Sequence, residues 1–275
     1  MKRKIILIII IIFTALLFKN YNALIHASNT AFEIWLYRVF PFLFIMIIIE
    51  DLLINLNFFK FFKKKSTYTF VMSLIGGTPV SAYITGKLYK EKQVSNKEAN
   101  KMLEFTYFSN PLFLYSILNL IFGSKFITIK LMLIHYASNL IMYLFSYKEF
   151  SYNSKDITTL DFSLPSSIKA SMNTTLMVLG AITFYFVISE ICITTFNMPE
   201  NIATLFKGFL ELTQGLNSLN GSPSELLAIL FISFGGVSIH TQVKCILDEY
   251  NLSYKNFLRG RILGSIIALV LTLIA

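Results

Sequence analysis

The chain has 275 residues, of which 55% are hydrophobic and 14% are charged, and its formal net charge is +9. Soluble domains carry roughly 25% charged residues, so this composition excludes an ordinary soluble domain and indicates several membrane spans of about 20 residues. The basic residues lie in short runs between apolar segments, which is typical of cytoplasmic loops. We therefore expect the lipid bilayer, and no nucleic acid, among the partners.

Two cysteines, Cys192 and Cys245, lie in or beside apolar segments without the spacing of a disulfide framework or a zinc site. We interpret both as small apolar residues of a packed interior, and we expect neither a metal nor a cofactor. The sequence contains no HExxH motif, no P-loop and no G-x-S-x-G motif. We therefore expect a protein that is not an enzyme and has no catalytic residues.

The first part of the chain alternates apolar runs with lysine-rich loops. The apolar run 5–18 follows a basic start, and we interpret it as an uncleaved span, with a signal peptide as the alternative. The next run, 39–59, contains Glu50 and Asp51 and leads into four lysines between positions 60 and 65, which predict a cytoplasmic loop. Residues 66–86 are broken at Gly76-Gly77-Thr78-Pro79, so we predict a broken or re-entrant hairpin there.

The segment 87–104 is polar and carries five lysines, with a capping box at Ser95 and Glu98. This pattern predicts an amphipathic helix at the cytoplasmic membrane surface. An apolar segment at 105–124 contains Ser109-Asn110-Pro111, and the next span is expected at 131–147.

The second part of the chain starts after a polar, serine-rich stretch at 148–169, which we predict to be a linker. Its apolar segments are 170–189, followed by Glu190, then the glycine-broken 207–221, then 226–243 with Gly235-Gly236, and finally 262–275. We predict an all-α polytopic membrane protein with about 6–8 membrane segments. It forms a single transmembrane transporter domain, 1–275, with halves at about 30–147 and 170–275.

Two stretches of the chain resemble one another. Gly235-Gly236 follows Gly76-Gly77 at an offset of 159 positions, and Ser253-x-Lys255 follows Ser95-x-Lys97 at an offset of 158. Paired Gly/Pro-broken segments in two halves are typical of transporter binding sites, and freed helix N-termini attract anions. Both Ser-x-Lys loops are basic, which favours placing both loops on one side of the membrane and hence a parallel repeat. The second loop, however, is nearly neutral overall, and we favour an inverted repeat.

At these residues the chain resembles a known family. The stretch 76–89, then Ser95, Glu98 and Ala99, then 108–113, resembles the first conserved block of the sporulation integral membrane protein family, and 209–215 with 233–242 resembles its second block. The first block departs from the usual Gly-Tyr-Pro-Val-Gly, since 77–81 reads Gly-Thr-Pro-Val-Ser. Such proteins carry nucleoside-recognition (Gate) domains and are similar to spore maturation proteins A and B and, more distantly, to concentrative nucleoside transporters.

The resemblance implies a transporter of a small anionic or nucleoside-like solute during endospore formation. Most specifically, it implies export of dipicolinic acid from the mother cell to the forespore, in the bacterial cytoplasmic membrane and there in the outer forespore membrane. A non-transporting membrane scaffold for spore envelope assembly is the alternative. The implied partners are the solute, the bilayer, a coupling ion and, in a homo-oligomer, further copies of the chain.

The candidate substrate-binding residues lie at or beside the predicted helix breaks. They are Gly76, Gly77, Thr78, Pro79, Ser109, Asn110, Glu211, Thr213, Gln214, Gly235, Gly236, Ser238, His240 and Gln242. Close helix packing is the alternative explanation for the glycines, and helix capping is the alternative for Ser109 and Asn110.

Glu50 and Glu211 are the candidates for ion or proton coupling, because ionisable groups inside apolar segments are costly and usually functional. For Asp51 and Glu190 an interfacial carboxylate explains the pattern equally well. His240 either takes part in proton transfer or substrate binding, or is a neutral imidazole that a carbonyl satisfies.

Overall fold

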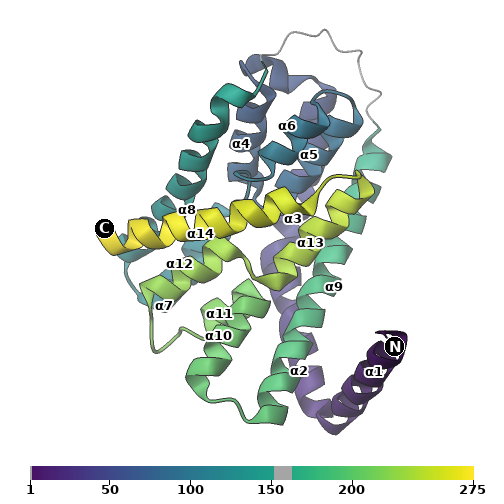
Figure 1. Ribbon diagram of the computed structural model, residues 1–275, viewed down its shortest axis with the longest axis vertical. Helices are drawn as coiled ribbons and strands as arrows, with labels where there is room; N and C mark the ends of the chain where they lie inside the picture. Colours follow the sequence, from purple (N-terminus) through teal and green to yellow (C-terminus); the bar gives the residue numbers. More distant parts are fainter. Residues whose placement is uncertain (1, 152–162) are drawn as a thin grey trace.

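The computed structural model describes residues 2–151 and 163–275, and every regular element in these residues is helical (Figure 1). Five helical segments are long and apolar enough to cross a membrane: Tyr21–Asn55, Lys125–Glu149, Leu164–Phe196, Glu225–Glu249 and Tyr254–Ile274. Together with a shorter apolar helix, Pro111–Phe122, they form an all-α polytopic membrane protein. The predicted 6–8 segments also included the interrupted segments 66–86 and 207–221, which form hairpins.

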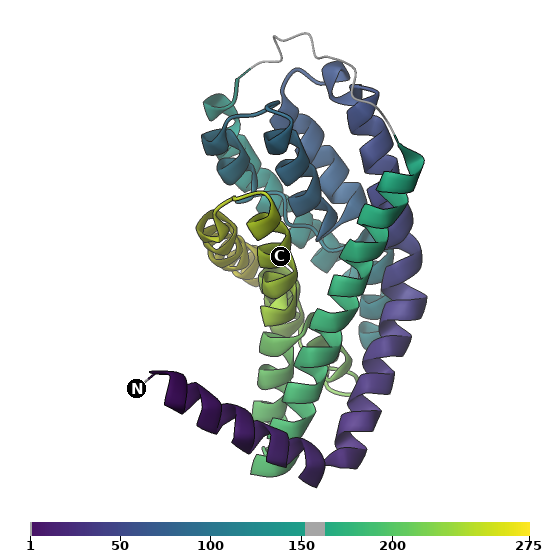
Figure 2. The same cartoon turned by 90° about the vertical axis from the view of Figure 1, so that its right-hand side faces the viewer.

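Two long spans lie side by side through the length of the molecule (Figures 1 and 2). The first consists of α2 (Tyr21–Ile34), a π-helical turn η1 (Trp35–Val39) and α3 (Phe40–Asn55), and the second is α9 (Leu164–Phe196). Polar bonds join them, since Trp35 Nε1 donates to the carbonyl of Thr175 at 2.8 Å.

These boundaries differ from the predicted ones. The run predicted at 39–59 extends back to Tyr21, because the chain passes through η1 without leaving the helix. In the predicted linker 148–169, residues 164–169 already belong to α9, while 152–162 lie outside the described residues.

The N-terminal helix α1 (Lys2–Lys19) projects from the rest of the molecule (Figure 2). Its isoleucine- and leucine-rich run Ile5–Ile12 is more than half exposed at every residue. A helix that is apolar on all sides suits a lipid environment. Its assignment as the first membrane span stays a prediction, since α1 is not among the five candidate spans.

Two helical hairpins enter the molecule from opposite ends (Figure 1). Hairpin 1 consists of α4 (Lys65–Gly76) and α5 (Val80–Lys90), which follow a short 3₁₀ turn η2 (Phe58–Phe61); hairpin 2 consists of α10 (Glu200–Leu210) and α11 (Leu212–Asn217). Hairpin 1 returns to the end at which it starts, because Lys65 Nζ donates to the carbonyl of Gln93 at 2.8 Å. This is the re-entrant arrangement predicted for 66–86.

Two broken segments follow the hairpins. Broken segment 1 consists of α6 (Asn96–Met102), the non-helical residues 103–110 and α7 (Pro111–Phe122); broken segment 2 consists of α12 (Glu225–Phe234) and α13 (Gly236–Glu249), which meet at Gly235. The capping box predicted at Ser95 and Glu98 is present. The amphipathic helix predicted over 87–104 is divided, because α5 ends at Lys90 and α6 begins at Asn96.

The remaining helices α8 (Lys125–Ser146, followed by a 3₁₀ turn η3, Tyr147–Glu149) and α14 (Tyr254–Ile274) pack against one another. Arg261 on α14 is fully buried and donates to the Glu104 carbonyl at 3.2 Å and to Asn139 Oδ1 at 3.1 Å. It also lies 4.1 Å from the ring centre of Tyr107. The last apolar run was predicted to begin at 262, just after Arg261, whereas the structure places Arg261 inside α14, where it ties this helix to α8 and broken segment 1.

The same order of elements occurs twice along the chain. The first series is α2–α3, hairpin 1, broken segment 1 and α8; the second is α9, hairpin 2, broken segment 2 and α14. The two glycine pairs that the sequence comparison matched therefore occupy different kinds of element. Gly77 lies at a hairpin tip, whereas Gly235 and Gly236 lie at the break of broken segment 2.

Candidate functional site

The tip of each hairpin packs against the break of a broken segment. Thr78 N donates to the Phe108 carbonyl at 2.8 Å, and a Cβ added at Gly77 would lie 3.1 Å from Asn110 N. Likewise, a Cβ added at Gly236 would lie 3.1 Å from Leu212 N. Both glycines have positive φ angles, +72° and +70°, which strain any residue with a side chain. These two positions thus require glycine for close backbone approach.

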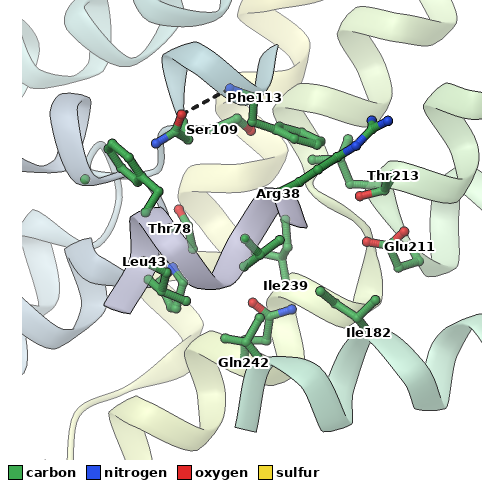
Figure 3. Close-up of a pocket in the computed structure, with 17 residues that line it drawn as sticks. Arg38, Leu43, Thr78, Ser109, Phe113, Ile182, Glu211, Thr213, Ile239 and Gln242 are labelled. Carbon is green, nitrogen blue, oxygen red and sulfur yellow. Dashed lines mark hydrogen bonds between the residues drawn. The ribbon is translucent and has the colours of Figure 1, made fainter. Parts of the chain in front are cut away.

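Side chains cap two helices that begin here, α7 at the break of broken segment 1 and α11 at the tip of hairpin 2. Asn110 Oδ1 accepts from Leu112 N at 2.9 Å and from Phe113 N at 3.1 Å, the second bond being the dashed line in Figure 3. Glu211 accepts from Gln214 N at 2.8 Å. These N-terminal amides therefore bond to caps of the chain itself, which differs from the expectation that freed helix ends would bind the solute directly.

A pocket lies where the tips and breaks meet, with about 690 Å³ of space that holds no protein atoms, part of which is open to solvent (Figure 3). Both hairpin tips, both broken segments and both long spans contribute to its wall. The lining residues are Arg38, Val39, Phe42, Leu43, Gly76, Thr78, Pro79, Ser109, Asn110, Phe113, Val178, Ile182, Glu211, Leu212, Thr213, Ile239 and Gln242.

The structure brings part of the predicted site together in this pocket. The predicted residues in its wall are Gly76, Thr78, Pro79, Ser109, Asn110, Glu211, Thr213 and Gln242. The predicted residues that do not line it are Gly77, Gly235, Gly236, Gln214, Ser238, His240 and Glu50. Sequence reasoning missed the wall of the two long spans, which supplies Arg38 and most of the apolar lining.

The predicted residues outside the pocket have other partners. Gln214 Nε2 donates to Glu190 Oε1 at 3.0 Å, and Ser238 Oγ accepts from Gln242 Nε2 at 3.2 Å. The imidazole of His240 bonds to the Phe234 carbonyl at 3.0 Å and to the Tyr254 hydroxyl at 2.6 Å. Because a carbonyl can only accept, His240 Nε2 carries a proton and donates it to Phe234, as the carbonyl-bonded alternative for this histidine expects.

Arg38 is the cationic side chain of the pocket wall. It is the central residue of the span Tyr21–Asn55, its side chain is exposed, and among the described residues it has no ion pair or hydrogen bond. In Figure 3 it extends toward the side on which Thr213 and Glu211 lie. The signal for this residue was present, because an arginine inside an apolar segment is usually functional. The predicted span, however, began at Val39, one position after it.

Two polar atoms in the pocket wall are buried without a hydrogen-bond partner among the described residues, namely Ser109 Oγ and Asn110 Nδ2. The backbone at this point is fixed from outside the pocket, since Ser109 N donates to His135 Nε2 at 3.2 Å and the His135 side chain is fully buried. His135 was not a predicted site residue, and a lone histidine in an apolar run gives no signal of such a contact. The opposite wall holds Glu211, which is 2% exposed.

Comparison with known proteins supports the assignment as a membrane protein similar to a sporulation protein, and nothing more specific. No family model matches the chain, so the nucleoside-recognition (Gate) domain stays an expectation, and no solved structure matches it. The chain is 26% identical over 324 residues to the sporulation integral membrane protein YlbJ of Bacillus subtilis (strain 168), over 95% of this chain and 79% of that protein. Together with its apolar helices, this likeness indicates that the chain is an integral membrane protein similar to a protein of sporulation.

Proposed function

We propose that this protein carries a small anionic solute across the membrane and that the pocket is its substrate site. The observation that carries the proposal is the composition of the pocket wall, to which both hairpin tips, both broken segments and both long spans contribute. Interrupted helices inside a membrane are tolerated only against protein or a wet cavity. In secondary transporters such breaks surround the substrate between two halves of the molecule.

The polar groups of the pocket favour an anion. The guanidinium of Arg38 can bind a carboxylate with two parallel hydrogen bonds. Asn110 Nδ2 and Ser109 Oγ, neither of which has a hydrogen-bond partner in the part of the chain that the structure describes, can donate further hydrogen bonds to the same ligand. The rest of the wall is largely apolar and includes the rings of Phe42 and Phe113, which suit a planar aromatic body. A small aromatic carboxylate such as dipicolinate combines these properties.

Glu211 gives the opposite wall a carboxyl group. It caps α11 and so belongs to the tip of hairpin 2. A bound anion would repel a charged Glu211, so an ion or a proton taken up there would favour binding. We therefore propose that an ion or a proton binds at Glu211 together with the solute. The gradient of this ion, and not nucleotide hydrolysis, then drives transport.

The repeated order of elements supports an inverted repeat. Hairpin 1 and hairpin 2 enter from opposite ends, and each tip packs against the break of the following broken segment in its own half. In this correspondence Gly77 is equivalent to Glu211, and Asn110 to Gly235, unlike the glycine-to-glycine match of the sequence. A rocking motion of one half against the other would expose the pocket to each side in turn.

The cellular setting follows from the likeness to a sporulation protein. We propose that the chain acts in the outer forespore membrane and moves dipicolinic acid from the mother cell to the forespore. Proteoliposomes that contain the purified protein should take up labelled dipicolinate, and nucleosides should not compete for uptake. A folded protein that neither binds nor moves any of these solutes would instead favour a scaffold of spore envelope assembly.

Arg38 provides the sharpest test of the pocket. Arg38→Gln should weaken dipicolinate binding by about tenfold or more, since loss of one charge-assisted pair costs roughly 1.5–3 kcal/mol. Arg38→Lys should retain part of the affinity, because it keeps the charge and loses only the bidentate geometry. The matched control is Arg259→Gln on α14, whose side chain is 67% exposed. Equal affinities for all three variants and the wild type would exclude the pocket as an anion site.

A further inference from the structure

Two adjacent carboxyl groups on α3, outside the pocket, have opposite surroundings. Asp51 accepts from Lys87 Nζ at 2.7 Å and from the Tyr83 hydroxyl at 2.5 Å. Its other oxygen accepts from Ser167 Oγ at 2.8 Å. Both carboxylate oxygens of Asp51 therefore accept hydrogen bonds, and the ammonium of Lys87 supplies the counter-charge. Asp51 is a satisfied, ion-paired carboxylate that holds hairpin 1 and α9 against α3.

Glu50 has no such partners. Its side chain is fully buried, Glu50 Oε2 accepts from the Tyr68 hydroxyl at 3.0 Å, and Glu50 Oε1 is buried without any hydrogen-bond partner among the described residues. No basic residue forms an ion pair with it there. A buried carboxylate with a bare oxygen and no cation is very costly, whereas a neutral carboxylic acid in the same place costs much less. The geometry therefore suits a carboxyl group that holds a proton.

The groups that face this site from the neighbouring elements are consistent with a proton. The ionisable side chains around it are Asp51 on α3, Lys65 and Tyr68 on α4, Tyr83 and Lys87 on α5, and Glu91 after α5. Lys65 Nζ bonds to the Gln93 carbonyl, and Tyr250, which follows α13, packs on Tyr83. Lys60 of η2 and Lys169 of α9 are exposed, and Arg38 of η1 lines the pocket. Lys87 is partly buried and is held by Asp51, and the ammonium of the buried Lys64 bonds to the Tyr147 carbonyl at 2.7 Å. No group of three or more His, Cys, Asp or Glu side chains in the described residues could hold a metal ion.

The site connects two elements that reach the pocket. Glu50 lies on α3, about 10 Å along the helix from Leu43 in the pocket wall, at 1.5 Å per residue. Tyr68 lies on α4, whose last residue Gly76 is also in the pocket wall. The hydrogen bond from Tyr68 to Glu50 therefore joins the long span to hairpin 1. Such a bond is stronger when the acceptor is ionised, so the protonation state of Glu50 changes how firmly hairpin 1 is held.

We infer that Glu50 is a proton-binding site coupled to substrate movement through hairpin 1. Its carboxylate takes up one proton from water on one side of the membrane and becomes a carboxylic acid, and the same proton leaves to water on the other side. The proton thus moves with the anionic solute and offsets one of its charges. This inference rests on the proposed function for the solute, but the proton site itself does not depend on it.

The first measurement needs no transport. Infrared spectroscopy of the purified protein in lipid nanodiscs should show the carbonyl band of a buried carboxylic acid, and Glu50→Gln should remove that band. Glu33→Gln, which alters an exposed carboxyl in the same long span, should leave it in place. Identical spectra for the wild type and Glu50→Gln would overturn the inference whatever the protein transports.

The second measurement uses proteoliposomes loaded with dipicolinate. In the wild type an imposed pH gradient, with the membrane potential clamped, should drive labelled dipicolinate against its concentration gradient. Glu50→Gln should lose this stimulation and keep the exchange of labelled for unlabelled solute. A normal response of Glu50→Gln to the pH gradient, or a wild type driven by sodium and not by protons, would overturn the coupling. If the wild type exchanges no dipicolinate, the proposed substrate fails, and the infrared result judges the proton site by itself.

Discussion

Replacing each of the neighbouring carboxyls by its amide should separate their roles. Asp51→Asn leaves Lys87 without its carboxylate partner at a place where the side chains are only 15% and 7% exposed. Breaking a buried pair by removing one partner costs about 3–5 kcal/mol. Glu91, 4.0 Å from Lys87 Nζ, offsets part of this loss, so we expect about 3 kcal/mol. Glu50→Gln replaces a neutral acid with a neutral amide of the same shape and should cost less, about 1–2 kcal/mol, because it adds one buried N–H without an acceptor.

Thermal unfolding of the purified proteins in one detergent checks both values. At about 2–4 °C per kcal/mol for a chain of this size, Asp51→Asn should lower the melting temperature by roughly 6–12 °C. At the same conversion Glu50→Gln should lower it by a smaller amount, roughly 2–8 °C. Lys87→Met combined with Asp51→Asn should recover part of the loss, because the unpaired ammonium is then gone. A larger destabilisation by Glu50→Gln than by Asp51→Asn would refute the assignment of Asp51 as the paired group and Glu50 as the neutral one.

Two further outcomes are expected. Gly77→Ala should destabilise the protein by about 1–2 kcal/mol, since it puts a side chain at positive φ. The control Gly180→Ala, in α9 with open space around it, should be neutral or slightly stabilising. Equal melting temperatures of the two variants would contradict this expectation. Burial of Glu98 opposes its charged form, but hydrogen bonds from Ser151 and Ser95 outweigh burial and lower its pKa to about 2. The depressed pKa stabilises the fold above about pH 4.3, the usual value for Glu, and this contribution is lost as the pH falls toward 2. Melting temperatures of wild type and Glu98→Gln should therefore converge over that range, and a constant difference would contradict the assignment.

The helix breaks were predictable from the sequence because their chemistry is local. Gly77 beside Pro79 cannot continue a helix, and Asn110 before Pro111 is a standard helix start. The resulting residues do gather around one pocket. Local chemistry does not show which element packs against each break. Without that information, Gly77 and Gly236 were expected to contact the substrate. They instead contact backbone atoms of Asn110 and Leu212, which is the packing alternative.

The missed residues depend on contacts between distant parts of the chain. Arg38 escaped notice because a π-helical turn continues the helix across a position at which the predicted span had already ended. Arg261 directly precedes the predicted last apolar run, yet its guanidinium is buried against backbone carbonyls and the ring of Tyr107. His135 matters because it fixes the backbone of Ser109 from 26 positions away in the sequence. Periodicity and motif spacing contain no information about such pairings.

The conflict between basic loops and an inverted repeat disappears once the elements are compared by their place in the fold. Ser253 N donates to Asn100 Oδ1 at 2.8 Å, so the two Ser-x-Lys loops lie at the same end of the molecule, as their lysines indicate. They are therefore not equivalents in an inverted repeat. The loops 123–124, 197–199 and 218–224 lie toward the opposite end and contain no lysine or arginine. Membrane orientation follows the charge of loops and not the recurrence of a motif. Opposite entry of the two hairpins is therefore compatible with an excess of lysines at one end, although Lys19 and Lys125 adjoin the turns of the other end. By this rule we expect the Glu50 site, on the lysine-rich side of the pocket, to lie nearer to the cytoplasm.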